Sequence, residues 1–374
     1  MQKSLDAKLA DIRQQPSSDS FIIAYAADAD MSRGLGTLDD RSHSMQAFCD
    51  ELATLVEQAK IDILLASVAN MDILAREMRI FADSPVTPAI RANDTTDIWN
   101  ARGSTYAALP SRPFATTTIE EAKYGTLTPA PEQKPDVDLG LYSVTFNNDL
   151  EADLHSLQCF KAFRTEAKAK GFKYFLEVFN PNIADCGIKP EQIPHFVNDQ
   201  IARMLAGIPR ASRPEFLKIA YNGPETMEAL AAYDASVIVG ILGGTTSTTY
   251  DAYKLIAEAK KHGARLALFG RRIKGSEDPL SFLEVLRLVA DGDTSPEEGV
   301  RFYRSKLEEK GVPAQRSLVD HVRAVAQGLR QSLSSVGCWA RWSKRRRRRE
   351  AARTRRALTP CCAAPSSRPP RVSA

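Results

Sequence analysis

Long apolar runs are missing from this sequence, and no stretch approaches the roughly 20 residues that a membrane-spanning helix needs. Residues 1–13 are charged and follow a helical pattern, without the apolar stretch of a signal peptide. We therefore expect no membrane partner and a cytoplasmic location.

Metal-binding and nucleotide-binding signatures are also missing. The cysteines form no C-x-x-C pair and no Cys/His cluster with ligand spacing. No G-x-G-x-x-G segment follows an expected strand, and no P-loop is present. We therefore expect no metal, no cofactor and no disulfide framework. The missing glycine motifs argue against a dinucleotide or nucleoside-triphosphate enzyme. The six cysteines are Cys49, Cys159, Cys186, Cys338, Cys361 and Cys362.

Acidic residues are nearly absent from residues 338–374, which hold twelve Lys or Arg and one acid, Glu350. Because the whole chain has a formal net charge of +4, residues 1–337 carry a net charge of −7. A polybasic tail can contact nucleic acid, but its low content of core-forming residues favours a disordered segment. We predict one folded domain over residues 1–337 and a disordered Arg-rich tail over 338–374. We expect no nucleic-acid partner, and removal of the tail is expected to leave the main activity intact.

Short apolar segments alternate along the chain with segments of helical spacing, which is typical of parallel βαβ units. Eight such units within about 270 residues match a (β/α)8 barrel better than an open doubly wound sheet. We therefore predict an α/β TIM barrel with extra C-terminal helices near 279–290, 295–310 and 316–333. The expected strands are 21–27, 61–67, 86–91, 137–146, 173–178, 215–223, 236–241 and 265–269.

Two connections carry polar residues close to the end of an expected strand. The first expected strand runs into Asp28 and Asp30 and then into a Ser/Gly loop. Residues 94–113 form a long polar and aromatic excursion in which we expect no regular element. Loops of that length in a compact domain are often functional.

A lysine, Lys218, interrupts the apolar stretch 215–223. Desolvating an ammonium costs several kcal/mol unless the group is paired or neutralised. Lys218 is therefore either a structural ion-pair partner or solvent-facing side chain, or an amine kept reactive by its surroundings, as Schiff-base enzymes require.

Glycines follow the seventh and eighth expected strands, where (β/α)8 barrels commonly bind phosphate. Backbone N–H groups, hydroxyls and a guanidinium at these two places favour a phosphate site. Tight turns required by packing are the alternative. The residues concerned are Gly243, Gly244, Thr245, Thr246, Ser247, Gly270 and either Arg271 or Arg272.

Taken together, Lys218, Gly243-Gly244 and Gly270-Arg271 resemble class I aldolases of the archaeal-type fructose-bisphosphate and deoxyribose-phosphate superfamily. The resemblance is best over residues 137–275; before them, only Asp28 takes the place of the family's first-strand aspartate. It implies a barrel in which Lys218 forms a Schiff base with a carbonyl substrate while the two glycine segments hold its phosphate.

The chain departs from this family after the fifth expected strand, where the family carries a tyrosine for proton transfer. Residues 176–180 contain no tyrosine, and Glu177 is instead similar to the strand-five glutamate of tagatose-bisphosphate-type class I aldolases. Glu177 either moves protons near Lys218 or forms a buried ion pair that only neutralises it. Asp28 is either a second acid/base or a loop residue. Arg91 either binds a second anionic group or pairs with Asp28.

We therefore predict a class I, metal-independent aldolase, a lyase, that acts on a phosphorylated sugar or related keto compound. A homo-oligomer is expected, because the extra C-terminal helices can pack against a neighbouring subunit. The alternatives are a phosphate-binding barrel isomerase or epimerase in which Lys218 acts electrostatically, and a catalytically degraded barrel that serves as a binding subunit. The predicted catalytic residues are Lys218, Glu177 and Asp28, and the predicted substrate-binding residues are Gly243, Gly244, Gly270, Arg271 and Arg91.

Overall fold

The computed structural model of the chain describes residues 1–15, 17–38, 44–244 and 248–314. All of them belong to the unit Met1–Leu329, and the second unit, Arg330–Ala374, lies wholly outside the described residues. Three predictions also fall outside them: the helix at 316–333, the tail at 338–374 and the hydroxyl residues 245–247.

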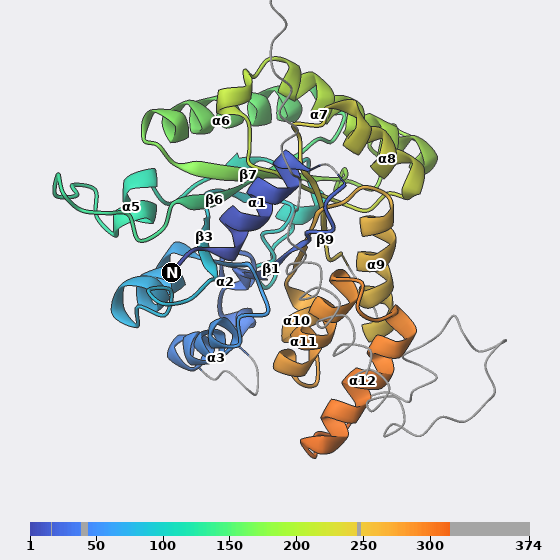
Figure 1. Ribbon diagram of the computed structural model, residues 1–374. Helices are drawn as coiled ribbons and strands as arrows, with labels where there is room; N and C mark the ends of the chain where they lie inside the picture. The colour runs from blue at the N-terminus through green and yellow to red at the C-terminus, as the bar shows by residue number, and fades with distance from the viewer. Residues whose placement is uncertain (16, 39–43, 245–247, 315–374) are drawn as a thin grey trace, which may run out of the picture. The chain divides into compact units, whose positions relative to one another are not determined.

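Eight parallel strands close into a barrel (Figure 1), which confirms the predicted (β/α)8 fold. Each of the eight predicted strands is present, and most are shorter than the apolar segment that indicated them. In order around the barrel the strands are β1 (Ile22–Ala27), β10 (Leu266–Phe269), β9 (Val239–Leu242), β8 (Leu217–Ile219), β7 (Lys173–Phe179), β6 (Leu139–Thr145), β3 (Thr87–Arg91) and β2 (Ile63–Ala66).

The helices begin where the sequence supplies capping side chains. Thr118 and Thr248 each form a capping box. The threonine side chain accepts a hydrogen bond from the backbone N–H three residues later, and the acidic side chain of that residue accepts one from the threonine backbone N–H. The helices around the barrel are α2 (Ala29–Arg33), α3 (Met45–Glu57), α4 (Val68–Met71) with the π-helical η2 (Asp72–Glu77), α5 (Ile119–Tyr124), α6 (Leu150–Ala169), α7 (Ile193–Ala206), α8 (Pro224–Tyr233), α9 (Thr249–Lys261), α10 (Arg271–Lys274) and α11 (Pro279–Ala290).

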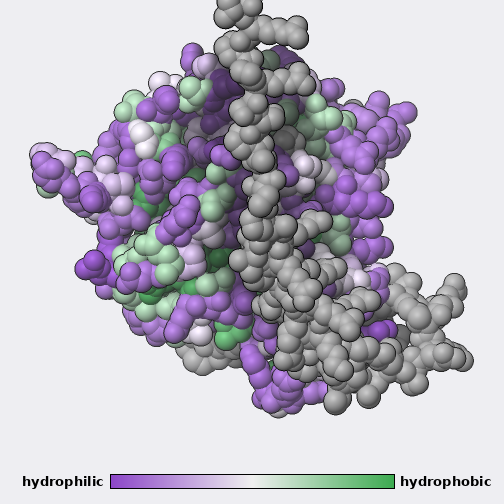
Figure 2. All heavy atoms as spheres, in the orientation of Figure 1, coloured by the Kyte–Doolittle hydropathy of each residue, from purple (hydrophilic) through white to green (hydrophobic). Residues whose placement is uncertain are grey.

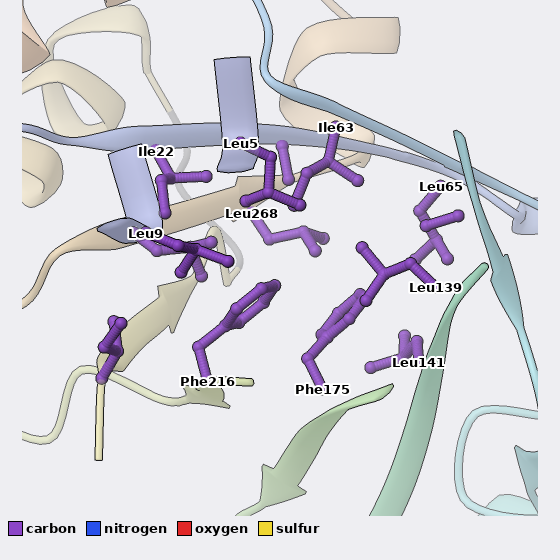
Figure 3. Packing of buried hydrophobic residues seen from close by; sticks show 14 of the residues in the cluster. Leu5, Leu9, Ile22, Ile63, Leu65, Leu139, Leu141, Phe175, Phe216 and Leu268 are labelled. Carbon is purple, nitrogen blue, oxygen red and sulfur yellow. The ribbon is translucent and has the colours of Figure 1, made fainter. Parts of the chain in front are cut away.

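The N-terminal helix α1 (Ser4–Gln14) closes the amino-terminal end of the barrel. Its apolar residues Leu5 and Leu9 pack with the inward-facing side chains of the strands (Figure 3). Among these, Phe175 and Phe216 stack with their ring centroids 4.6 Å apart. The barrel interior near the amino ends of the strands is therefore a packed apolar core, and the polar interior residues lie toward the carboxyl ends of the strands.

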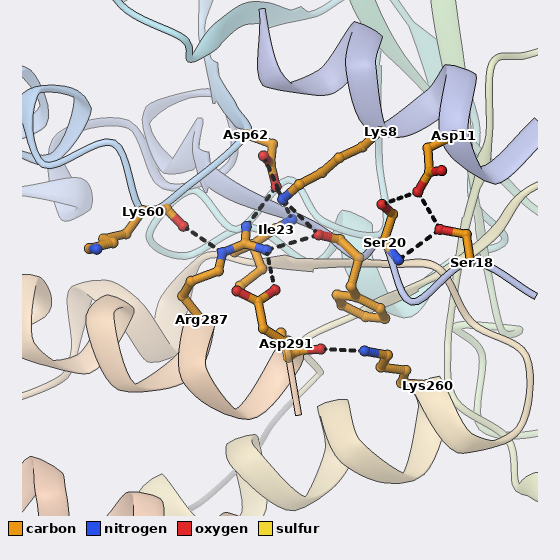
Figure 4. A network of polar contacts seen from close by, with 12 residues as sticks. Lys8, Asp11, Ser18, Ser20, Ile23, Lys60, Asp62, Lys260, Arg287 and Asp291 are labelled. Atoms are coloured by element: carbon orange, nitrogen blue, oxygen red, sulfur yellow. Dashed lines mark hydrogen bonds and ion pairs between the residues drawn. The ribbon is translucent and has the colours of Figure 1, made fainter. Parts of the chain in front are cut away.

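The carboxylate of Asp62, just before β2, fastens two helices to the barrel (Figure 4). It accepts the backbone N–H of Ile23 at 2.8 Å, the Lys8 ammonium at 2.9 Å and the Arg287 guanidinium at 2.6 Å. Burial alone would raise the pKa of Asp62, but Arg287 and Lys8 outweigh it and lower that pKa. This network holds α1 and α11 against the amino-terminal face, away from the open end.

The excursion 94–113 contains regular elements, so the expectation that it has none was wrong. Strands β4 (Asp94–Thr95) and β5 (Pro113–Phe114) pair antiparallel, and η3 (Tyr106–Ala108) lies between them. Strands of two residues carry no periodic signal in a sequence, which is why the pattern missed them. The helix that follows, α5, is short.

The loop expected after the first strand is also helical. It forms α2 and then the 3-10 helix η1 (Gly34–Thr37). The short helices η4 (Pro190–Gln192) and η5 (Arg210–Ser212) occur in other connections.

An extra C-terminal helix, α12 (Pro296–Glu309), packs beyond the eight βα units, as predicted. Phe282 of α11 stacks on Tyr253 of α9 at 5.3 Å and meets the edge of Tyr303 of α12 at 6.0 Å. On the face shown in Figure 2, hydrophilic residues predominate and apolar residues form small patches. Within the described ranges, no helix is long and apolar enough to cross a membrane.

Candidate active site

Three polar side chains lie side by side on adjacent strands of the barrel. Glu177 of β7 is in register with Ser143 of β6 on one side and with Lys218 of β8 on the other. Residues at the same register of neighbouring strands point to the same face, and side chains alternate along a strand. Because Phe175 faces the interior core, Glu177 faces the interior one layer nearer the carboxyl end.

Lys218 and Glu177 form a buried ion pair, between the lysine Nζ and the glutamate Oε1. Only 5% of Lys218 and 1% of Glu177 is exposed to solvent. A charged pair this deeply buried is stable only with good geometry and further hydrogen bonds to its free lone pairs. Here the further hydrogen bonds are made to the other carboxylate oxygen, Glu177 Oε2.

Ser143 and Asn93 fix the orientation of the Glu177 carboxylate. The Ser143 hydroxyl donates to Glu177 Oε2 at 2.8 Å. The Ser143 backbone is held by Asn93, which accepts its N–H at 2.7 Å and donates to its carbonyl oxygen at 2.9 Å. Glu177 therefore presents Oε1 to Lys218 while Oε2 is bound by the protein.

Arg91, at the end of β3, pairs with Asp28, which follows β1. Its Nε donates to Asp28, its Nη1 to the Ser143 hydroxyl at 3.0 Å, and its Nη2 lies 3.5 Å from Glu177 Oε2. Burial opposes ionisation of Asp28, but Arg91 and Lys218 outweigh it and hold the pKa of that carboxyl below its usual value. Of the two alternatives for Arg91, the structure shows the pairing with Asp28.

Two glycine segments approach each other at the ends of β9 and β10. The Arg271 Nη2 donates to the Gly244 carbonyl oxygen at 3.4 Å, which links the two segments. A Cβ on Gly270 would fall 2.7 Å from the Ala26 carbonyl oxygen, so packing alone requires that glycine. Gly244 is different: it has a φ of +55°, and no atom of the described residues lies closer than 3.8 Å to its Cβ position. Among the described residues, nothing therefore crowds this backbone, as an anion site requires.

One cavity of about 1140 Å³ at the carboxyl ends of the strands brings all the predicted site residues together. Three more cations line it, Arg33 of α2 and Arg272 and Lys274 of α10. The described part of the chain contains no group of three or more His, Cys, Asp or Glu residues that could hold a metal ion. The eight predicted residues in the cavity lining are Lys218, Glu177, Asp28, Gly243, Gly244, Gly270, Arg271 and Arg91.

Sequence reasoning missed Ser143 and Asn93. Ser143 lies in the predicted strand 137–146, on the same face as the inward-pointing Leu141. A polar residue on the inward face near the carboxyl end of a barrel strand was the available signal. Asn93 carries no such signal, because it lies beyond its strand and acts through a backbone contact.

Asp94, in β4, offers a test of how far this region is desolvated. Burial raises the pKa of this carboxyl to about 6, although its Oδ1 accepts the Thr95 N–H at 2.8 Å. A carboxyl whose pKa is higher in the folded state than in the unfolded state destabilises the fold once it ionises, so the penalty grows from about pH 4 to pH 6 and persists above. Asp94→Asn is therefore expected to raise the unfolding free energy by ~1–2 kcal/mol at pH 8 and to leave it unchanged at pH 4.

Urea unfolding at the two pH values measures this difference. The exposed Asp83→Asn serves as the control and is expected to change little at either pH. A difference for Asp94→Asn that does not vary with pH contradicts the proposed cause.

No protein-family model and no curated protein matches the sequence. Solved structures do match. An archaeal fructose-1,6-bisphosphate aldolase is 17% identical, with a TM-score of 0.53 over 76% of this chain and 99% of that one. An archaeal aldolase whose catalytic lysine is covalently bound to the carbinolamine intermediate of its substrate is 17% identical, with a TM-score of 0.54 over 76% and 100%.

A fructose-bisphosphate aldolase from Slackia heliotrinireducens is 14% identical, with a TM-score of 0.58 over 80% of this chain and 89% of that one. Identities this low establish the fold and leave the activity open. At the level of the fold, the resemblance stated from the sequence is confirmed: the chain has the (β/α)8 barrel fold of these aldolases.

Proposed function

We propose that the chain is a class I aldolase, a lyase that forms a Schiff base with a phosphorylated sugar or related keto compound. One observation carries the proposal: the buried amine of Lys218 contacts a carboxylate inside a cavity that Gly243, Gly244 and Arg271 also line. Structural neighbours that are Schiff-base aldolases support it through their shared fold.

The first chemical step is formation of an imine on Lys218. A lysine attacks a carbonyl only when deprotonated, and the Glu177 Oε1 in contact with its Nζ can accept that proton. The amine adds to the substrate carbonyl to give a carbinolamine. Glu177 then returns its proton to the departing hydroxyl, which leaves as water, and a protonated imine remains.

The second step is cleavage of the carbon–carbon bond. Glu177, again ionised, takes the proton of the substrate hydroxyl, and the aldehyde leaves. The bonding electron pair moves into the protonated imine, which becomes an enamine. Glu177 then gives its proton to the enamine carbon, and water hydrolyses the imine to free Lys218 and release the ketone.

Arg91 and Asp28 act through their neighbours in this scheme. Arg91 and Ser143 bind Glu177 Oε2, which leaves Oε1 free to exchange protons with Lys218 and the substrate. Because its pKa is lowered, Asp28 is ionised at neutral pH and balances the charge of Arg91. We therefore assign Asp28 a positioning role.

The anion-binding end is proposed to hold the substrate phosphate through Gly243, Gly244, Gly270 and Arg271. Arg271→Ala is expected to weaken binding of inorganic phosphate and of phosphorylated ligands by ~1.5–3 kcal/mol, because it removes a charge-assisted hydrogen bond. Isothermal titration measures the change. Arg203→Ala, an exposed arginine on α7, is the matched control and is expected to bind as the wild type does. Unchanged affinity in Arg271→Ala would place the anion site elsewhere.

The buried ion pair also supports a second candidate, a sugar-phosphate isomerase or epimerase. In that enzyme Glu177 moves the proton and Lys218 stays an ammonium that stabilises an enediolate. Product analysis with a panel of sugar phosphates separates the two, since an isomerase releases no aldehyde fragment. The cytoplasmic location and the homo-oligomer stay predictions from the sequence.

A further inference from the structure

The cations of the cavity lie toward one side of the barrel. Arg271, Arg272 and Lys274 follow β10, and Arg33 follows β1, the neighbour of β10. On the side of β7, β6 and β3, Arg91 is the one Lys or Arg among the described lining residues. All three of its guanidinium nitrogens already have partners, as described above.

Uncharged side chains also line the cavity on this second side. Phe179 ends β7 two residues after Glu177, so its side chain points to the same face of the strand. Ile98 and Asn100, from the excursion, line the cavity with it. A second phosphate placed against Phe179 would approach the carboxylates of Glu177 and Asp28, and the one cation on the side of β7, β6 and β3, Arg91, already has partners.

The excursion is fastened on both sides of Ile98, so this wall is fixed in place. Before it, Asp97 accepts hydrogen bonds from Ser111 and Thr145, both at 2.9 Å. After it, the Asn100 backbone N–H donates to the Ser32 carbonyl oxygen of α2 at 2.7 Å. A wall held this way cannot withdraw easily to admit a hydrated charged group, whose burial without a partner is costly.

Lys218 lies between the glycine segments after β9 and β10 and the wall formed by Phe179 and Ile98. Its strand, β8, has β9 and β10 on one side and β7 on the other. A substrate whose phosphate binds the glycine segments after β9 and β10 therefore crosses Lys218 and places its far end against Phe179 and Ile98.

We infer that the chain selects monophosphorylated keto compounds whose end remote from the phosphate is uncharged, and that Phe179 and Ile98 exclude a second phosphate. This inference rests on the proposed function for the orientation of the substrate across Lys218. When the ketone fragment carries the phosphate, the released aldehyde has an uncharged carbon chain, unlike the aldehyde released from a bisphosphate.

The test uses ligands that cannot react. Glucitol 1-phosphate and glucitol 1,6-bisphosphate have no carbonyl group, so they report binding whether or not an imine forms. Isothermal titration of the wild-type protein is expected to show the monophosphate binding roughly tenfold or more tightly, because like-charge contact and unpaired burial disfavour the second phosphate. Phe179→Arg supplies a cation at this wall and is expected to reduce or reverse the preference.

Ile98→Arg repeats the test from the excursion in case Phe179→Arg does not fold. Tyr233→Arg changes an exposed aromatic residue on α8, 62% exposed, and is expected to keep the wild-type preference. Equal or tighter binding of the bisphosphate by the wild type overturns the inference, as does binding of neither ligand. The aldolase proposal has its own readout, covalent trapping at Lys218, so the two can fail separately.

Discussion

Lys218→Met is expected to abolish turnover while leaving the barrel folded and able to bind phosphate. Methionine has a similar volume and no charge, and it cannot form an imine. Removal of a nucleophile typically costs several orders of magnitude in kcat, so we expect a loss of ~10⁴-fold or more. Retro-aldol cleavage, followed as release of aldehyde from phosphorylated ketoses, measures the effect.

The surroundings of Lys218 explain why the fold should survive. When the ammonium is removed, Glu177 keeps the Ser143 hydroxyl and the Arg91 guanidinium as partners. Lys123→Met is the matched control. Lys123 is also buried, 6% exposed, and donates to the Lys170 carbonyl oxygen outside the cavity at 2.8 Å. The control variant should retain turnover per folded molecule; full activity in Lys218→Met would eliminate the aldolase proposal.

Glu177→Gln is expected to reduce both turnover and stability. Loss of general acid–base catalysis typically lowers kcat by ~10²–10⁴-fold. Removing one partner of a buried ion pair leaves the other charge uncompensated, and we expect a loss of roughly 3 kcal/mol in unfolding free energy. Steady-state kinetics and urea unfolding measure the two effects.

This variant also separates the two roles that the sequence left open for Glu177. If the carboxylate only neutralises Lys218, imine formation will not slow in Glu177→Gln. If it moves protons, imine formation and cleavage both slow. The double variant Glu177→Gln/Lys218→Met should be less destabilised than Glu177→Gln alone, because the uncompensated ammonium is gone. Additive losses would contradict the pairing.

The sequence predicted the barrel and the cavity residues for the same physical reason. Buried parallel strands appear as short apolar segments, and the residues after them converge at the carboxyl end of a closed sheet. Lys218 was identified as a lysine within a predicted strand, and Gly244 and Arg271 from their positions after predicted strands. The cavity unites them because the strand order places β8, β9 and β10 side by side.

Features that depend on contacts between segments far apart in the chain could not be predicted from the sequence. The pairing of Arg91 depends on Asp28, which lies 63 positions away along the chain. The orientation of Glu177 depends on a serine on the neighbouring strand and on the asparagine that holds it. Ile98 lines the cavity because hydrogen bonds fasten an excursion that has no periodic pattern.

Borohydride trapping tests the central claim most directly. When borohydride is added with a phosphorylated ketose, reduction of the imine should inactivate the protein and leave the substrate skeleton covalently attached. Peptide mass mapping should place the adduct on Lys218, with none in Lys218→Met and none when borohydride is added without substrate. Loss of activity with an adduct at Lys218 is the result that this account predicts. An active cleavage enzyme with no adduct, or with an adduct at another lysine, would contradict it.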